Sequence, residues 1–216
     1  MVLKTSLLRF MKEGVIECGV DEAGRGPLFG RVYTAAVILP TNSDFDFSLI
    51  KDSKRFTSKK KLHAVCDYIK EHSLAYAITY EDEKTIDEIN ILQATVRSMH
   101  RSIRALDMIP EHILIDGNYF KPYCHTEERN GDYIIRQIPN TCVKKGDDTY
   151  VSIAAASILA KCERDAYIQE LCIAEPELDL KYGLSTNMGY GTKRHREGIH
   201  EHGLSAYHRK SFTLKS

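Results

Sequence analysis

The chain has 216 residues and no net formal charge, with 43% hydrophobic and 28% charged residues. This composition is that of a folded globular protein, and it offers no bulk electrostatic attraction for nucleic acid or for a membrane. No stretch approaches the roughly 18 apolar residues of a membrane span, and no signal peptide is evident. The six cysteines form no C-x-x-C pair, which disfavours a zinc ribbon, and we expect reduced thiols in the cytoplasm.

The first half of the chain predicts strands and helices in turn. Residues 15–21 and 31–40 are typical of two strands, and the glycine-rich connection between them favours a hairpin-like start. Thr57 or Ser58 is a candidate cap for a helix that runs to about Glu71, and residues 73–80 alternate as a third strand. Apolar residues then recur every three or four positions from Lys84 to about Leu106, which predicts a helix with a break near Asn90.

The second half adds one buried strand and the strongest helix of the chain. Residues 112–117 predict a short strand that ends on an acid and a glycine, whereas strand boundaries between 132 and 147 are ambiguous. The helix expected over 149–172 carries small residues that allow it to lie close against a sheet. A basic helix is expected over 192–203, between a Thr192 cap and a Gly203 stop.

This order of elements predicts an α/β layer fold with a mixed sheet. We expect one domain over 1–216, in which about 181–216 form a small basic helical extension. Residues 181–216 carry a formal charge of +5, and residues 51–61 also carry +5. Either segment, taken alone, is equally well explained as a solvated face.

Acidic residues stand at or near three predicted strand ends. Asp21 ends the first strand and Glu22 follows it, Asp116 lies at the end of the strand of 112–117, and Asp147 ends the segment VKKGD. Two carboxylates about 4 Å apart repel by roughly 4 kcal/mol at an effective dielectric of 20, so four together require cations. Oxygen ligands suit Mg²⁺ or Mn²⁺, and two such ions form the clamp used in phosphodiester hydrolysis. Each motif alone is more often a surface turn, so only convergence in space would support the site.

The motifs also occur in the order found in a known family. The series GVDEAGRGPLFG, NILQAT, LIDGN, VKKGDD, SIAAASILAKCERD, GYGTKRH and YHRKSF resembles ribonuclease HII over residues 15 to 213. The resemblance implies the ribonuclease H-like fold, a mixed five-stranded sheet flanked by helices. It also implies an endonuclease with two Mg²⁺ or Mn²⁺ ions per site, held by Asp21, Glu22, Asp116 and Asp147 as catalytic residues.

The activity implied is the cleavage of the RNA strand of RNA–DNA hybrids and incision 5′ of single ribonucleotides in duplex DNA. The products would carry 3′-hydroxyl and 5′-phosphate ends, and the protein would act in ribonucleotide removal. We expect a monomer. Asp148 is an alternative fourth carboxylate, and Asp165 is interpreted as structural or supporting.

The resemblance also assigns residues to the substrate. Gly24, Arg25 and Gly26 would bring the backbone close to the ribose 2′-hydroxyl, the group that distinguishes RNA from DNA. Tyr190 would stack on the sugar. Phosphate contacts are expected from basic residues and one serine, namely Ser53, Lys54, Lys145, Lys193 and Arg209, with Arg194, Arg196 and Lys210 nearby.

Four C-terminal histidines, His195, His200, His202 and His208, have no i, i+4 spacing and favour surface or substrate-side roles over metal binding. Alternatives to the leading hypothesis are a catalytically silent hybrid-binding protein, a ribonuclease HIII-like enzyme, and a magnesium-dependent phosphatase.

Overall fold

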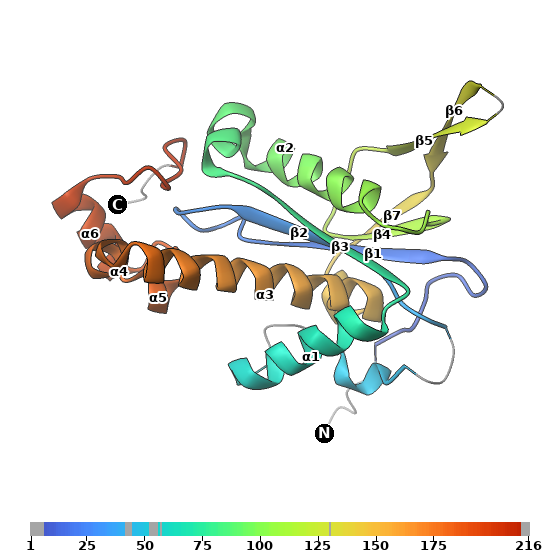
Figure 1. Ribbon diagram of the computed structural model, residues 1–216, viewed down its shortest axis with the longest axis horizontal. Helices are drawn as coiled ribbons and strands as arrows, with labels where there is room; N and C mark the ends of the chain where they lie inside the picture. The colour runs from blue at the N-terminus through green and yellow to red at the C-terminus, as the bar shows by residue number, and fades with distance from the viewer. Residues whose placement is uncertain (1–6, 42–44, 52–55, 57, 130, 213–216) are drawn as a thin grey trace.

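A mixed five-stranded sheet runs through the middle of the molecule (Figure 1). The computed structural model describes residues 7–41, 45–51, 56, 58–129 and 131–212. The strand order is β3 (Ala75–Glu81), β2 (Val32–Ile38), β1 (Glu17–Ala23), β4 (His112–Asp116) and β7 (Asn140–Val143). Strand β2 runs antiparallel to both β3 and β1, while β4 runs parallel to β1 and β7 parallel to β4. The prediction of a mixed five-stranded sheet is confirmed.

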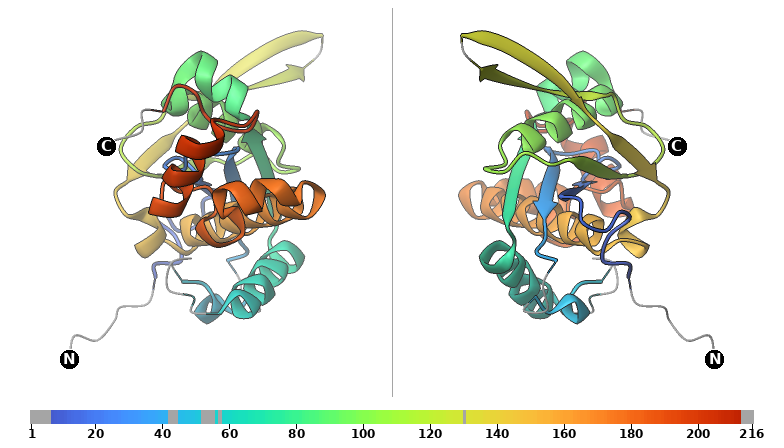
Figure 2. Two further views of the ribbon diagram at one scale, coloured as in Figure 1. Left: turned by 90° about the vertical axis from the view of Figure 1, so that its left-hand side faces the viewer. Right: turned by 90° about the vertical axis from the view of Figure 1, so that its right-hand side faces the viewer.

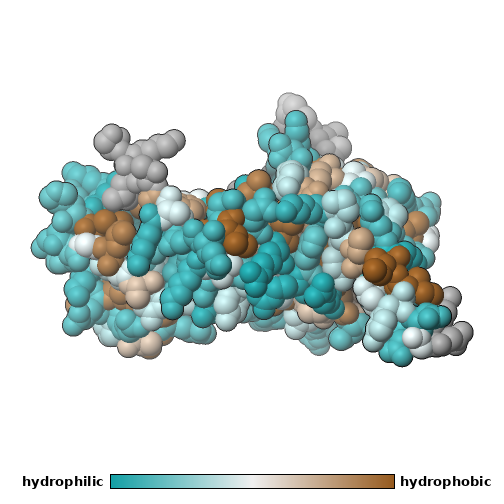
Figure 3. All heavy atoms as spheres, turned by 90° about the horizontal axis from the view of Figure 1, so that it is seen from above, coloured by the Kyte–Doolittle hydropathy of each residue, from teal (hydrophilic) through white to brown (hydrophobic). Residues whose placement is uncertain are grey.

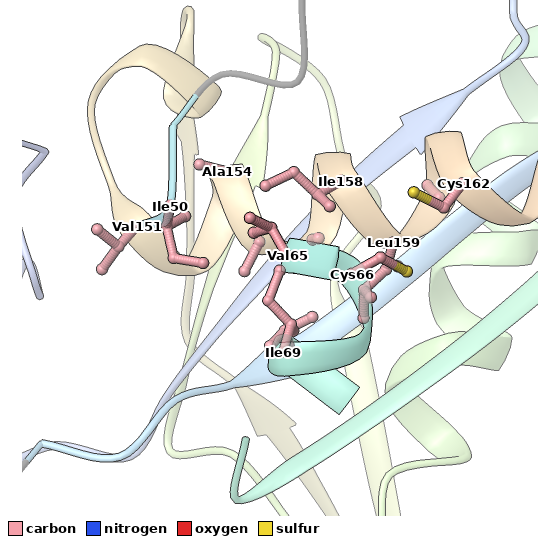
Figure 4. Close-up of a cluster of buried hydrophobic side chains, with 14 of the residues drawn as sticks. Ile50, Val65, Cys66, Ile69, Val151, Ala154, Ile158, Leu159 and Cys162 are labelled. Carbon is pink, nitrogen blue, oxygen red and sulfur yellow. The ribbon is translucent and has the colours of Figure 1, made fainter. Parts of the chain in front are cut away.

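The long helix α3 (Val151–Ala174) lies close against the central strands. The close approach is possible because the first turns of α3 carry small side chains and β1 presents a glycine to them. A Cβ placed on Gly19 would stand 2.1 Å from the carbonyl carbon of Ser152, so only glycine permits this approach. Helix α1 (Lys59–His72), capped by Ser58, packs on the outer side of α3 (Figure 2). The core between these elements includes Ile69, Ile158 and Leu159 (Figure 4).

The opposite face of the sheet is covered by α2 (Glu83–Arg104). Its buried stripe, with Met99 and Ile103, packs on the apolar side chains of β1, β2 and β4. The break expected near Asn90 is present, since this residue has φ 65° and ψ 163° inside the helix. Its side-chain oxygen accepts from the amides of Leu92 and Gln93 and so recaps the second part of α2.

A two-stranded hairpin includes the first part of the segment whose strand boundaries were ambiguous in the sequence, and its first strand precedes that segment. Strands β5 (Tyr123–Arg129) and β6 (Asp132–Ile138) pair with each other and project from the body beside the end of α2 (Figures 1 and 2). Tyr123 and Ile138 at its base are buried, while Tyr133 and Ile135 are largely exposed. The hairpin is therefore anchored at one end only.

The C-terminal part is helical, as expected. It comprises α4 (Pro176–Tyr182), α5 (Leu184–Asn187) and α6 (Lys193–His202), with single turns of 3-10 helix elsewhere at η1 (Phe47–Leu49) and η3 (Gly146–Asp148). Thr192 caps α6 and Gly203 ends it. Phe29, Tyr182 and Ile199 form a separate small core that ties these helices to the loop between β1 and β2. None of the described helices combines the length and hydropathy that a bilayer span requires.

Candidate active site

A polar cleft of about 290 Å³ opens at the end of β1, between the loop that follows this strand and α3. Residues 21–26 form one wall, Asp116 of β4 contributes from the neighbouring strand, and Tyr190 lines the cleft from the C-terminal part. Helix α3 supplies the remaining lining side chains, which are Ser157, Lys161, Arg164 and Asp165. Segments separated by more than a hundred residues thus meet at one place.

Asp21 and Glu22 lie in this cleft at adjacent positions of β1. Burial, followed by the charges of Glu22 and Asp116, raises the pKa of Asp21 well above its usual value, although a hydrogen bond from Ser157 opposes the shift. Burial also raises the pKa of Glu22, against the effect of Arg25, whose Nη1 lies 3.3 Å from the Glu22 Oε1. Asp21 and Glu22 are therefore a buried acidic pair whose negative charge is partly balanced by Arg25.

Asp116 joins this pair through the parallel pairing of β1 and β4, which ends both strands at the same edge of the sheet. Its Oδ1 accepts a hydrogen bond of 2.6 Å from the amide of Gly146. Asp147, the next residue, is buried, while Asp148 is exposed. Asp147 was expected at a strand end, and this was wrong: β7 ends at Val143, and Asp147 lies on the turn η3.

The loop after β1 is held by a buried arginine from the far end of the chain. Arg209 is only 2% exposed, and its guanidinium donates to the carbonyl oxygens of Gly24 (2.7 Å), Arg25 (3.2 Å), Pro27 (2.8 Å) and Gly30 (2.8 Å). The expectation that Arg209 contacts phosphate is therefore corrected. Its donors are directed at the loop and none of its side chain lines the cleft.

Gly24 and Gly26 differ in whether the surrounding structure has room for a side chain. Gly24 has φ +98°, and a Cβ there would meet the Nε of Arg164 at 2.3 Å. A Cβ on Gly26 would have only the Tyr190 ring within 4 Å, at 3.6 Å. Glycine is thus required at 24 by the fold, whereas at 26 it leaves the backbone open to the cleft.

Tyr190 is half-exposed, and a pair of buried histidines supports its backbone. The Nδ1 of His208 accepts from the amide of Ser205 (2.9 Å), so its Nε2 carries the proton that bonds the Nε2 of His195 (3.0 Å). His195 then donates from Nδ1 to the Tyr190 carbonyl (2.9 Å). Surface or substrate-side roles were expected for both histidines, and this was wrong: each is almost fully buried.

Four residues of α3 line the cleft without having been predicted to do so as a group. They recur at positions 157, 161, 164 and 165, which is one helix face. Arg164 is buried beneath Gly24 with its Nε unpartnered among the described residues, and Lys161 pairs with Asp165 at 2.9 Å. The helical spacing of polar residues inside an apolar helix is the signal that could have identified them.

Comparison with known proteins settles the family. The model of the family described as Ribonuclease HII matches residues 18–215. The chain belongs to the ribonuclease HII family. A curated relative named Ribonuclease HII, from Parabacteroides distasonis, is 47% identical over 208 residues, which cover 96% of this chain and 95% of that protein.

Two solved structures share the fold at lower sequence identity. The ribonuclease H2 from Pyrococcus horikoshii OT3 has a TM-score of 0.71 at 21% identity, covering 91% of this chain and 93% of that chain. The structure of Bst-RNase HIII in complex with Mn²⁺ has a TM-score of 0.62 at 23% identity, covering 88% of this chain and 63% of that chain. These likenesses confirm the ribonuclease H-like fold.

Ribonuclease HII enzymes are metal-dependent endonucleases, and the cleft of this member of the family suits a divalent ion. Its acidic side chains offer oxygen donors only, which is the preference of Mg²⁺ and Mn²⁺. The raised pKa of Asp21 arises partly from two neighbouring carboxylates, a repulsion that a cation would relieve. Within the described ranges, no group of three or more His, Cys, Asp or Glu side chains is arranged to hold a metal ion as it stands.

The remaining predicted substrate residues of this ribonuclease HII lie outside the cleft or outside the described residues. Lys145 is exposed beside η3, and Lys193 is exposed on α6 with its Nζ 3.7 Å from the Oε1 of Glu197. Neither lines the cleft. Ser53 and Lys54 lie outside the described residues. All six cysteines are free thiols, as expected.

Proposed function

We propose that this enzyme hydrolyses the RNA strand of RNA–DNA hybrids and incises duplex DNA on the 5′ side of a single ribonucleotide. One observation carries the proposal: Gly24–Gly26, Tyr190 and the carboxylates of Asp21, Glu22 and Asp116 line one cleft. The residues proposed to contact ribose and the residues proposed to hold the metal ions thus line the same cleft.

Ribose recognition is assigned to the loop 24–26 and to Tyr190. Gly26 leaves room for a sugar between the backbone and the Tyr190 ring. Loop polar groups that pair with a 2′-hydroxyl are left without a partner when deoxyribose binds. Discrimination of this kind reaches roughly 10⁴-fold in favourable cases. Arg209 and the pair His195–His208 act indirectly, because they fix the backbone that makes these contacts.

The reaction follows from the position of the cut. When a single ribonucleotide follows a deoxynucleotide, no 2′-hydroxyl neighbours the phosphate between them, so the nucleophile at this 5′ phosphate is water. The water oxygen bonds to phosphorus, the bond from phosphorus to the 3′ oxygen of the preceding nucleotide breaks, and that oxygen takes up a proton. The products are a 3′-hydroxyl and a 5′-phosphate.

Asp21, Glu22 and Asp116, with Asp147 as the fourth carboxylate, would hold two Mg²⁺ or Mn²⁺ ions. Bound divalent ions supply Lewis-acid stabilisation of charge at the phosphate and a lowered pKa for water. The protein residues keep the carboxylates in place. Ser157 donates to Asp21, and the amide of Gly146 orients Asp116 from the turn that carries Asp147.

The test uses duplex DNA with one internal ribonucleotide, an all-DNA duplex and a long RNA–DNA hybrid, each with Mg²⁺ or Mn²⁺. We expect cleavage 5′ of the ribonucleotide and within the hybrid, no cleavage of the all-DNA duplex, and loss of cleavage with a chelator. Binding of the hybrid without cleavage under any of these ionic conditions would instead support a silent hybrid-binding protein.

We further propose that residues 1–216 act as one catalytic unit and as a monomer in the cytoplasm. The six free cysteines support a reducing compartment, and the small core around Phe29 joins the C-terminal helices to the loop after β1. Light scattering coupled to size-exclusion chromatography tests the oligomeric state, and a mass near 24.6 kDa is expected.

A further inference from the structure

A second, larger hollow lies on the outer side of α2, and half of its lining residues are lysine or arginine. This α2 groove encloses about 710 Å³, and its lining includes Val96, Arg97, His100, Arg101, Arg104 and Lys121. No aspartate or glutamate is among the described residues that line it. Seen from the α2 side, the middle of the molecule is mostly hydrophilic (Figure 3).

The cations of the α2 groove occupy one stripe of the helix. Arg97, Arg101 and Arg104 follow one another at four and three residues, so they lie on the same face, opposite the side chains that α2 buries against the sheet. Like charges at this spacing destabilise a helix by a few tenths of a kcal/mol per pair. Glu81 relieves part of this repulsion, with an Oε1 3.5 Å from the Nε of Arg97 and 3.0 Å from Nη1 of Arg101. Four cations thus face one carboxylate, a surplus of three positive charges.

The strand-to-hairpin connection closes one side of the α2 groove. The Nε2 of His100 lies 2.9 Å from the carbonyl oxygen of Lys121, and the His100 ring packs against the rings of Phe120 and Tyr123. The Nζ of Lys121 donates to the Oε1 of Gln93 on α2 at 2.6 Å. These contacts fix Lys121 beside the arginine stripe.

The α2 groove and the catalytic cleft are neighbours on the surface, because a third, small hollow shares lining residues with each of them. A small hollow between them is lined by Glu22, Arg25 and Asp116 at one end, which also line the cleft, and by Val96 at the other, which also lines the α2 groove. Asn118 and Tyr119 form its outer edge. An elongated ligand that enters the cleft can therefore extend across Tyr119 onto α2.

We propose that the α2 groove binds the phosphate backbone of the substrate duplex beyond the scissile site. The inference rests on the proposed function, because only a polymeric polyanion would occupy the cleft and the α2 groove together. The acidic cleft repels phosphate, whereas duplex DNA carries one charge about every 1.7 Å of its axis and attracts cations without regard to sequence. Arginine stripes of this kind position a duplex and do not read its bases.

The test compares two charge reversals in the α2 groove, Arg104→Glu and Lys121→Glu, with the matched reversal Lys12→Glu. Lys12 is exposed, and its amide contacts Glu17, at the end of β1 opposite to the cleft. Binding is measured on all-DNA duplexes of about one and two helical turns, roughly 10 and 20 base pairs, over a series of salt concentrations. Cleavage is measured on the same duplexes with one ribonucleotide.

We expect the groove variants to bind the longer duplex about 10-fold more weakly than Lys12→Glu does, with the loss in KM rather than kcat. The slope of log Kd against log salt should fall by about one per lost phosphate contact. Equal binding and equal salt slopes for Arg104→Glu, Lys121→Glu and Lys12→Glu would overturn the proposal. Absence of cleavage by the unaltered enzyme would refute the proposed function instead, since the all-DNA binding series reports on the α2 groove independently.

Discussion

The guanidinium of Arg209 donates a 2.7 Å hydrogen bond to the carbonyl oxygen of Gly24, although 184 residues separate the two along the chain. Three more carbonyl oxygens of the same loop, from Arg25, Pro27 and Gly30, accept from the same side chain. The C-terminal part of the enzyme therefore sets the shape of the loop proposed to contact ribose.

Replacing Arg209 by glutamine should reduce both stability and cleavage. The planar fork of arginine serves four carbonyls, and buried acceptors left without donors cost about 1–3 kcal/mol each. We expect Arg209→Gln to lower the free energy of unfolding by at least about 2 kcal/mol, and Arg209→Lys to give a smaller loss. Urea denaturation and kcat/KM on the ribonucleotide duplex measure the effects. The neighbouring exposed Lys210→Gln is the control, and equal behaviour of the two glutamine variants would refute the role.

The two glycines of the loop should respond differently to alanine. Gly24→Ala adds a methyl group against Arg164 and strains a residue at φ +98°, which should cost about 1–3 kcal/mol of stability. Gly26→Ala has room for the methyl group, so its stability should stay within about 0.5 kcal/mol while kcat/KM falls at least about 10-fold. Melting temperatures and cleavage rates separate the two effects. A stable, fully active Gly26→Ala enzyme would argue against close backbone approach to the sugar.

Acid should destabilise the enzyme through its buried histidine pair. Burial, and then the neighbouring His195, lowers the pKa of His208 from 6.5 to about 4. The unfolded chain therefore binds a proton that the folded chain does not between these values, so stability is full above about pH 6.5 and is lost toward pH 4. The loss is at most about 1.4 kcal/mol per pH unit for this residue.

None of the described groups that contact His208 carries a negative charge that could stabilise its protonated form. Ser205 donates to its Nδ1, the rings of Phe29 and Tyr182 pack on it, and His195 is the neutral acceptor of its Nε2–H. We expect His208→Gln to show a shallower acid dependence of melting temperature than the unaltered enzyme, while the exposed His200→Gln retains the full slope. Parallel curves for all three proteins would show that protonation of His208 does not cause the loss of stability in acid.

Neighbouring acids on the turn η3 provide a matched test of the fourth carboxylate. Asp147 is buried and directly follows Gly146, whose amide donates a hydrogen bond to Asp116, whereas Asp148 is exposed. Calorimetric titration with Mn²⁺ should show binding weakened at least about 10-fold by Asp147→Asn and changed less than about 2-fold by Asp148→Asn. The reverse order would assign the fourth carboxylate to Asp148.

The sequence predicted the elements well where local pattern determines them. Helix α6 begins after Thr192 and ends before Gly203 as expected, because helix caps depend on local sequence. The break at Asn90 is also local, since its side chain accepts a hydrogen bond from the amide of Leu92 in the following turn. The pairing of β1 with β4, which brings Asp21 to Asp116, depended on the resemblance, since spacing along the chain carries no information on parallel pairing.

Arg209 and the histidines His195 and His208 are buried, although the sequence predicted that they would be exposed. A basic C-terminal segment is typical of a phosphate-binding surface, so Arg209 and the histidines were expected outside. Their burial depends on acceptors that come from distant segments, the carbonyls of residues 24–30 for Arg209 and of Tyr190 for His195. Only the folded chain brings such donors and acceptors together.

The most direct test of the carboxylate site is single-turnover cleavage of a duplex with one ribonucleotide, in Mn²⁺, by two variants of the same cleft. Asp116→Asn removes a proposed ion ligand, and Asp165→Asn removes an acid that pairs with Lys161. We predict that Asp116→Asn lowers the rate by about 100-fold or more while Asp165→Asn lowers it no more than about 10-fold. Near-normal cleavage by Asp116→Asn, or a larger loss in Asp165→Asn than in Asp116→Asn, would contradict the account.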